Sequence, residues 1–133
     1  MLYLLDTNVV SAALKGSVSV DRRLPETPAS DWCISAVTRS ELRFGVARRP
    51  EVTRLAEIVD AFLSVARTMS WDAHAADEHG RLRAHLADRG RRMGDFDEMI
   101  AAHALALRAV LVTDNVRRFS RVPGLEVENW VRA

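Results

Sequence analysis

Short apolar runs alternate with longer segments of mixed polarity along this chain of 133 residues. A continuous apolar run is typical of a strand that is buried on both faces of a sheet. Such runs predict strands at 2–5, 32–35 and 109–113, and two further short strands are expected at 67–70 and 125–128.

Helices are predicted between these strands. Residues 50–65 begin with Pro50, which suits the first turn of a helix, and present one apolar face. That face consists of Leu55, Ile58, Val59, Phe62 and Leu63. Residues 96–107 are apolar almost all round, which predicts a buried helix. Further helices are expected at about 8–14, at 38–48 after a capping box (TRSE, 38–41), at 72–89 with Asp72 as its cap, and at 116–119, with loops at 25–31 and 90–94.

Strands that alternate with helices predict a parallel sheet with both faces covered by helices. The chain has no internal repeat and no low-complexity tract. We therefore expect a single domain, 1–133, of the α/β class. It should be a three-layer α/β/α sandwich around a central, mainly parallel sheet of four to five strands.

Four acidic residues end or open these predicted elements. Asp6 and Asp114 end apolar strands, while Glu41 lies one turn into a helix and Asp97 lies in the first turn of the buried helix. Ligands of open α/β sheets bind beyond the carboxyl ends of the strands. Carboxylates gathered there repel one another unless a cation neutralises them, and oxygen ligands suit Mg²⁺ or Mn²⁺. The pattern favours a metal site and phosphate ester chemistry.

Each acid also has a purely structural interpretation. Asp6 and Asp114 are each able to form a capping or Asx turn with the residues that follow. Glu41 is the reciprocal partner of Thr38 in the capping box, and Asp97 complements the positive end of a helix dipole. The four positions alone leave these interpretations open.

Five local sequences together resemble PIN-domain nucleases, and among them VapC-type toxins of bacterial toxin–antitoxin pairs. They are residues 4–8 (LLDTN), 35–45 (SAVTRSELRFG), 97–104 (DEMIAAHA), 111–115 (LVTDN) and 122–130 (VPGLEVENW). The resemblance covers the chain from end to end. It implies a parallel sheet with helices on both sides and a metal-dependent ribonuclease site made of three or four acids.

The resemblance also implies roles for particular residues. Asp6, Glu41 and Asp97 match the near-invariant acids of the family. Asp114 matches its fourth position, where relatives carry Asp or Asn. Asp95 is a nearby competitor, but Asp97 has the family's place before the Ile-Ala-Ala run at 100–102. By the same resemblance Thr7 and Thr113 line the pocket, and Asn8 orients Asp6 or a phosphate group.

Basic and polar residues near the acids are candidates for substrate contacts. They are Asn115, Arg43, Arg117, Arg118, Arg121 and the loop 89–92. A solvated charge run explains the arginines equally well, and Arg43 is equally suited to pair with an acid. His74, Glu78 and His79 do not match a zinc-binding helix motif, and His103 is interpreted as structural.

Composition narrows the setting. The formal net charge is +1, and Lys15 is the single lysine among nineteen basic residues, a bias that a GC-rich genome explains. One cysteine, Cys33, excludes an internal disulfide and fits a reducing compartment. No stretch is apolar enough to span a membrane, and no basic segment typical of a signal peptide precedes the first strand. The cytoplasm is the expected location.

The expected activity is hydrolysis of RNA phosphodiesters with one or two Mg²⁺ or Mn²⁺ ions bound by the four acids. The resemblance implies a homodimer that stops translation by cutting transfer or ribosomal RNA. It also implies neutralisation by a VapB-like antitoxin, with a higher toxin–antitoxin assembly on operator DNA.

Two rival functions come from other classes. A receiver-like signalling domain also gathers acids at strand ends around Mg²⁺, but it needs a lysine late in the chain, and Lys15 comes too early. The second is a non-catalytic DNA-binding or regulatory PIN module that acts in complex with its partner. The intact set of acids disfavours it.

Overall fold

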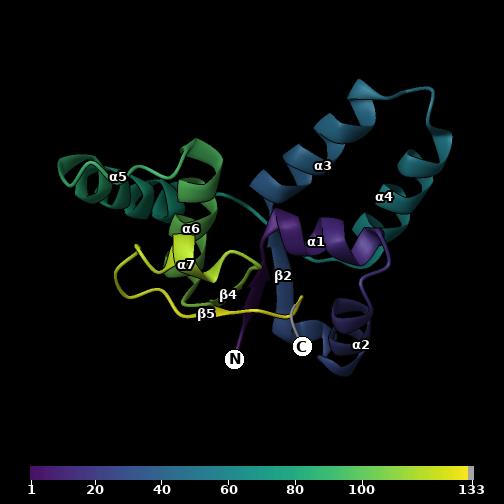
Figure 1. Ribbon diagram of the computed structural model, residues 1–133, viewed down its shortest axis with the longest axis horizontal. Coiled ribbons are helices and arrows are strands. Elements are labelled where there is room, and N and C mark those ends of the chain that lie inside the picture. The colour runs from purple at the N-terminus through teal and green to yellow at the C-terminus, as the bar shows by residue number, and fades with distance from the viewer. Residues whose placement is uncertain (132–133) are drawn as a thin grey trace.

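A computed structural model describes residues 1–131. Five parallel strands form one sheet, in the order β3-β2-β1-β4-β5. The strands are β1 (Tyr3–Leu5), β2 (Trp32–Ser35), β3 (Thr68–Met69), β4 (Val110–Val112) and β5 (Val127–Glu128). The predicted parallel sheet is therefore confirmed, with β1 at its centre (Figure 1).

The strand register separates the sheet into two apolar faces. One row of cross-strand neighbours is Leu4, Cys33 and Leu111, and the next row is Leu5, Ile34 and Val112. Successive residues of a strand point to opposite faces, so each row packs into a different core. The α/β/α arrangement follows from this double burial, as the continuous apolar runs predicted.

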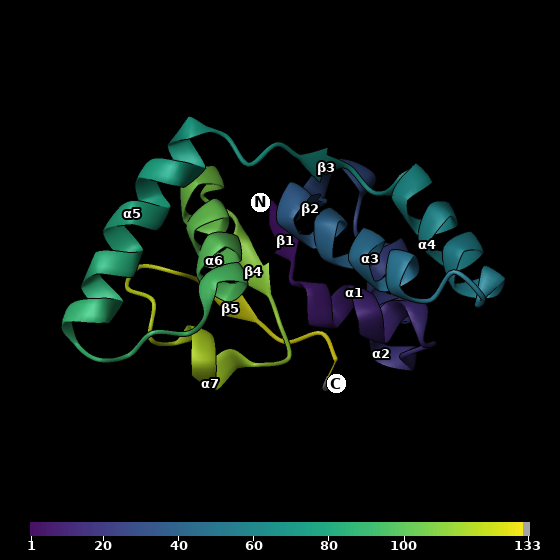
Figure 2. The same cartoon turned by 90° about the horizontal axis from the view of Figure 1, so that it is seen from above.

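Helices cover both faces (Figures 1 and 2). The face with Leu4 packs on α5 (Ala73–Asp88), α6 (Asp95–Leu107) and α7 (Val116–Phe119). The face with Leu5 packs on α1 (Thr7–Leu14), α2 (Val18–Glu26) and α4 (Thr53–Val65), while α3 (Ala36–Arg48) contributes Leu42 to the same core. Within residues 1–131 no helix combines the length and the apolar character needed to cross a membrane.

Two predicted helix starts were wrong. Helix α3 begins at Ala36 because the hydroxyl of Ser35, at the end of β2, accepts a hydrogen bond from the Val37 N–H at 3.1 Å. The capping box at 38–41 therefore lies inside the helix. Helix α4 begins at Thr53 rather than at Pro50, since the Val52 N–H donates to the Arg49 carbonyl at 3.0 Å and closes a turn first.

One helix was missed altogether. Helix α2 runs from Val18 to Glu26 and carries Pro25 in its last turn, where a loop was predicted. Val20 is its buried residue, so the apolar repeat that would reveal the helix is missing from the sequence. The predicted cap of α5 is confirmed, because the Asp72 carboxylate accepts from the Ala75 N–H at 3.0 Å.

Candidate functional site

Asp6 lies at the carboxyl end of the central strand and is 2% exposed. Its two oxygens are fixed separately: Oδ1 accepts from the Asn8 N–H at 2.8 Å, and Oδ2 accepts from the Thr113 hydroxyl at 2.6 Å. Burial raises the pKa of Asp6 above its ordinary value. The two hydrogen bonds lower this pKa, and the charges of Asp97 and Asp114 raise it further.

Glu41 reaches the same region from α3. The Thr7 hydroxyl donates to Glu41 Oε1 at 2.7 Å, and the Thr7 and Thr38 hydroxyls are hydrogen-bonded at 3.0 Å. Burial raises the pKa of Glu41, the bond from Thr7 lowers it, and the charges of Asp97 and Asp6 raise it. Thr38 and Glu41 thus belong to a contact between α1 and α3 rather than to a helix cap.

Asp97 and Asp114 complete the cluster from the other side of β1. Arg118 Nε, on α7, donates to Asp97 Oδ2 at 2.9 Å. Asn129 Nδ2 donates to Asp114 Oδ1 at 3.2 Å. Charge interactions connect Asp6 with Asp97 and Asp114, and they connect Glu41 with Asp6 and Asp97. The structure therefore brings the four predicted acids together at one end of the sheet.

The competitor Asp95 lies differently. Its side chain is 70% exposed and accepts from Arg92 Nη2 at 2.7 Å. Asp97 lies two residues after Asp95 on the same helix. Its charge raises the pKa of both Asp6 and Glu41. This geometry favours Asp97 over Asp95 as the member of the cluster.

The candidate substrate contacts divide into polar residues that contact the acids or their neighbours, and arginines. Asn8, Thr7 and Thr113 contact the acids, and the Asn115 N–H donates to the Thr113 hydroxyl at 3.0 Å. Arg117 is exposed on α7, next to Arg118.

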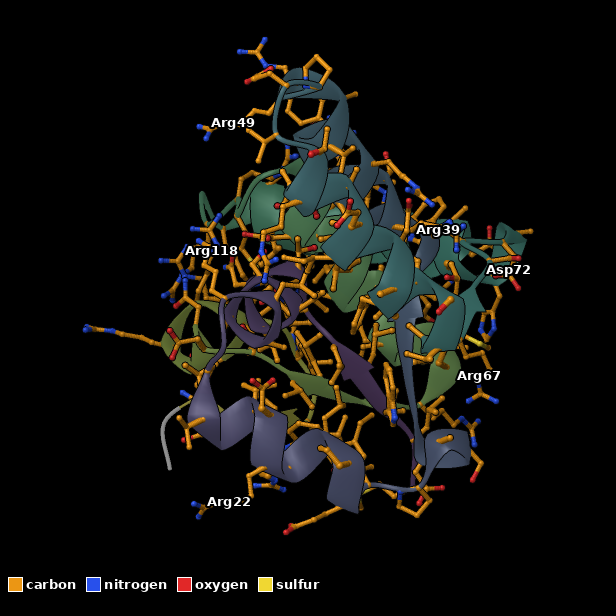
Figure 3. The ribbon with its side chains drawn as sticks, turned by 90° about the vertical axis from the view of Figure 1, so that its right-hand side faces the viewer. Arg22, Arg39, Arg49, Arg67, Asp72 and Arg118 are labelled. Atoms are coloured by element: carbon orange, nitrogen blue, oxygen red, sulfur yellow. The ribbon has the colours of Figure 1, made fainter. Side chains whose placement is uncertain are left out.

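Arg43 is the exception among these candidates. Its Nη1 donates to Asp60 on α4. The structure does not bring Arg43 to the four clustered acids. Its ion pair with Asp60 instead matches the second interpretation, in which Arg43 pairs with an acid. Figure 3 shows Arg118 on the opposite side of the view from Arg39 and Arg67.

Glu98 was missed by sequence reasoning. It is fully buried in the first turn of α6, accepts from Arg92 Nε at 2.9 Å through both oxygens, and accepts from the Met93 N–H at 2.8 Å. Burial raises the pKa of Glu98, but the bonds from Arg92 and Met93 outweigh it, and the pKa lies below its ordinary value. Glu98 thereby fixes the loop that precedes Asp97. Its signal was its spacing: Glu98 comes three and four residues before the buried Ala101 and Ala102, on the same face of α6.

His103 has the structural role that was expected. It is buried, and its Nδ1 shares a 2.8 Å hydrogen bond with the hydroxyl of Ser35, the residue that caps α3. Burial lowers the pKa of His103, which favours the neutral ring. The histidine thus supports the start of the helix that carries Glu41.

The donor set fits a hard divalent cation. Its four acids supply oxygen ligands, and two of them have pKa values that burial and neighbouring charge raise, a state that a bound cation relieves. In the conformation described for residues 1–131, no three His, Cys, Asp or Glu side chains stand close enough to share one ion. In this conformation hydroxyl groups and Arg118 hold the carboxylates.

Comparisons with known proteins point to one group of nucleases. The PIN domain family model matches residues 3–125. The tRNA(fMet)-specific endonuclease VapC of Shigella flexneri is 37% identical over 128 residues, which cover 96% of this chain and 97% of that protein. The DNA-bound VapBC structure from Salmonella typhimurium is 36% identical with a TM-score of 0.91, covering 98% of this chain and 99% of that one. VapBC2 from Rickettsia felis, bound to a DNA fragment from its promoter, is 34% identical with a TM-score of 0.90 over the same shares.

The chain thus combines a parallel sheet between two layers of helices with full-length similarity to one group of nucleases. Asp6 and Asp114 lie at the carboxyl ends of two of its strands. The chain belongs to the PIN-domain family, in its VapC ribonuclease branch. Membership of this family implies the use of a divalent metal ion.

Proposed function

We propose that this chain is a single-domain, metal-dependent endoribonuclease toxin in which Asp6, Glu41, Asp97 and Asp114 hold Mg²⁺ or Mn²⁺. The observation that carries the proposal is the convergence of these acids from β1, α3, α6 and the end of β4. A bound divalent cation would supply a water of lowered pKa and positive charge for the phosphate.

The chain's own residues orient the site. Thr113 and the Asn8 N–H hold Asp6 in one rotamer, and Thr7 does the same for Glu41. Arg118 stands beside the acids, and Arg117 is exposed next to it on α7; guanidinium groups suit the oxygens of a phosphodiester. Attack by water in line with the leaving oxygen leaves a 3′-hydroxyl and a 5′-phosphate.

The proposed substrate is RNA, with transfer RNA as the first candidate and ribosomal RNA as the second. The support comes from a relative: the Shigella flexneri protein is named a tRNA(fMet)-specific endonuclease. Loss of intact transfer or ribosomal RNA would stop translation.

The proposed partner is a VapB-like antitoxin. Solved neighbours are described as VapBC complexes. In this chain a groove of about 410 Å³ runs between α1, α3 and α4 and reaches the acids at Thr7 and Glu41. Its walls are mostly aliphatic, including Leu14, Leu42, Val52, Leu55, Ile58 and Val59. An apolar segment of an antitoxin suits this groove, with a basic side chain at the acidic end. We propose a homodimer as the working form.

A DNA-bound regulatory module is the second candidate. Two neighbours, VapBC from Salmonella typhimurium and VapBC2 from Rickettsia felis, are described as bound to DNA. Operator binding by the toxin–antitoxin complex is compatible with nuclease activity of the free toxin. Binding to DNA without any cleavage under Mg²⁺ or Mn²⁺ would favour the regulatory function alone.

The test is an incubation of antitoxin-free protein with total bacterial RNA in Mn²⁺ or Mg²⁺, alongside Asp6→Asn protein. Discrete fragments with 5′-phosphate ends are expected from the native protein, and EDTA or the substitution should abolish them. Intact RNA under both metals, from protein whose fold is verified by circular dichroism, contradicts the proposal.

A further inference from the structure

A cavity between α3 and the start of α6 combines two aromatic rings with polar groups of the site. It measures about 410 Å³ and is lined by Thr7, Ser40, Glu41, Phe44 and Phe96. Phe44 is 65% exposed and Phe96 is 56% exposed. One exposed apolar side chain is ordinary on a protein surface, but two rings that line one cavity beside acids of the site indicate a binding function.

The position of each ring follows from the elements that carry the acids. Phe44 comes one turn after Ser40 on α3, so the two side chains lie on the same face of that helix as the cavity. Phe96 directly precedes Asp97 in the first turn of α6. Figure 2 shows α3 and α6 on either side of β1, and the cavity is lined by one ring from each of these two helices.

This aromatic cavity differs from the antitoxin groove with which it shares Thr7 and Glu41. The groove is walled mainly by aliphatic side chains, which suit an apolar peptide. The aromatic cavity offers flat rings and, beside them, hydroxyl and carboxylate oxygens. Proteins use this combination for unpaired nucleobases, because every base has a face that stacks and an edge that forms hydrogen bonds.

One arginine lies beside the Phe44 ring, and two others pair with the acids on either side of Phe96 in the sequence, Arg92 with Asp95 and Arg118 with Asp97. The Arg48 guanidinium carbon is 6.0 Å from the centre of the Phe44 ring. Arg92, four residues before Phe96, and Arg118 have side chains that are 36% and 34% exposed. The acids alone would repel a nucleic acid, whereas an arginine next to a stacking ring offers a contact for the adjoining phosphate. Rings that stack on bases, together with these arginines, favour a nucleotide over an apolar peptide as the occupant.

We propose that Phe44 and Phe96 form a binding site for an unpaired nucleobase of single-stranded RNA next to the scissile phosphate. The site positions the RNA strand over the acids and restricts cleavage to loops, bulges and ends. This inference rests on the proposed ribonuclease function and names the form of RNA that it accepts.

The test compares Phe44→Leu and Phe96→Leu with Phe44→Trp, Phe96→Tyr and the control Val65→Ala. Val65, on α4, is an apolar side chain that is 71% exposed and lies outside the cavity. Binding is measured by fluorescence anisotropy in the inactive Asp6→Asn background, with a short single-stranded RNA that spans the mapped cut. Each leucine substitution is expected to weaken binding about fivefold or more, since stacking on an aromatic ring is worth about 1–3 kcal/mol per base. The aromatic replacements and the control should bind like the parent.

A second arm replaces one nucleotide beside the cut with an abasic residue. The loss of the base should weaken binding to the parent protein. In the leucine variants the same loss should weaken binding little further, because the ring and the base contribute through one shared contact. Native affinity in both leucine variants overturns the proposal. So does a loss of affinity that accompanies a change in assembly mass by light scattering, since the rings would then form a protein contact. If native protein cuts RNA while the rings prove unimportant, the base site alone fails; if native protein cuts no RNA, the ribonuclease function fails.

Discussion

Arg118 Nε lies 2.9 Å from Asp97 Oδ2, so a guanidinium from α7 already neutralises one acid of the cluster. Both side chains are about one-third exposed, which makes the pair a modest interaction rather than a buried one. If Asp97 holds the proposed metal ion, Arg118 and the cation would compete for this carboxylate, and a displaced guanidinium would be available to phosphate.

Arg118→Ala is therefore expected to increase the affinity for Mn²⁺. A partly exposed ion pair contributes about 0.2–1 kcal/mol, so the affinity should rise by up to about fivefold. Isothermal titration calorimetry measures this gain without any reaction. Arg121→Ala, an exposed arginine two residues beyond the end of α7, is the matched control. Unchanged or weaker Mn²⁺ binding by Arg118→Ala would show that the pair does not compete with the ion.

Thr113→Val is expected to destabilise the fold and the site together. Thr113 is fully buried, donates to Asp6 Oδ2 and accepts from the Asn115 N–H, so the valine leaves buried polar groups without partners. The expected loss in the free energy of unfolding is about 1–3 kcal/mol. Urea denaturation measures it, with the exposed Thr53→Val as control. A change within about 0.5 kcal/mol would contradict this role of Thr113.

Asp6→Asn is expected to raise stability near neutral pH in EDTA. The folded-state pKa of Asp6 lies above its ordinary value of 3.8, chiefly because of burial. The folded state therefore binds more protons between the two values, and the free energy of unfolding falls as pH rises through that window. Asn caps a helix as well as Asp and carries no charge.

The pH dependence distinguishes this explanation from a general effect of the substitution. The advantage of Asp6→Asn over native protein should be complete above the folded-state pKa and should shrink as pH falls toward 3.8. Mn²⁺ should stabilise native protein more than the variant, because only the folded native site holds the ion fully. Urea midpoints across pH test both points. A variant that is less stable than native protein at pH 7 in EDTA contradicts this prediction.

Glu98→Gln is expected to release the loop 90–94 from α6. The substitution removes the charge that accepts from Arg92 and Met93 at a fully buried position. A loss of about 1–3 kcal/mol is expected near neutral pH. Because the pKa of Glu98 is lowered in the folded state, this contribution is present above its ordinary value of 4.5 and disappears as pH falls through the folded-state value.

Hydrogen exchange across residues 90–97 measures this release locally. Faster exchange there is expected in Glu98→Gln. It is not expected in Glu78→Gln, which breaks a surface pair with Arg81. Equal protection in the two variants would mean that Glu98 does not hold the loop.

Much of the sheet and of the acid cluster could be predicted because their signals are local and strong. The run from Leu2 to Leu5 is apolar throughout because β1 is buried on both faces, and Asp6 follows it directly. In a parallel sheet, residues at strand ends share one edge, so Asp6 and Asp114 were expected to meet. Glu41 was expected near them because it lies one turn into the helix after β2, and Asp97 because the amino end of its helix should point the same way.

The failures share a physical cause. The capping box at 38–41 satisfies a local rule, but Ser35 caps α3 earlier and Thr7 takes Glu41 as its acceptor. The pair of Arg118 with Asp97 and the turn of Arg43 toward Asp60 depend on how separate helices pack. Such contacts between distant segments leave no periodic or local pattern in the sequence.

The most direct test of the shared metal site is the affinity for Mn²⁺, measured by calorimetry for native protein and for single substitutions of its acids. The substitutions are Asp6→Asn, Glu41→Gln, Asp97→Asn and Asp114→Asn, with Asp95→Asn as the neighbouring control. Each of the four should weaken ion binding about tenfold or more, while Asp95→Asn should bind like native protein. Native affinity in Asp97→Asn together with lost binding in Asp95→Asn would contradict a site built on the four converging acids.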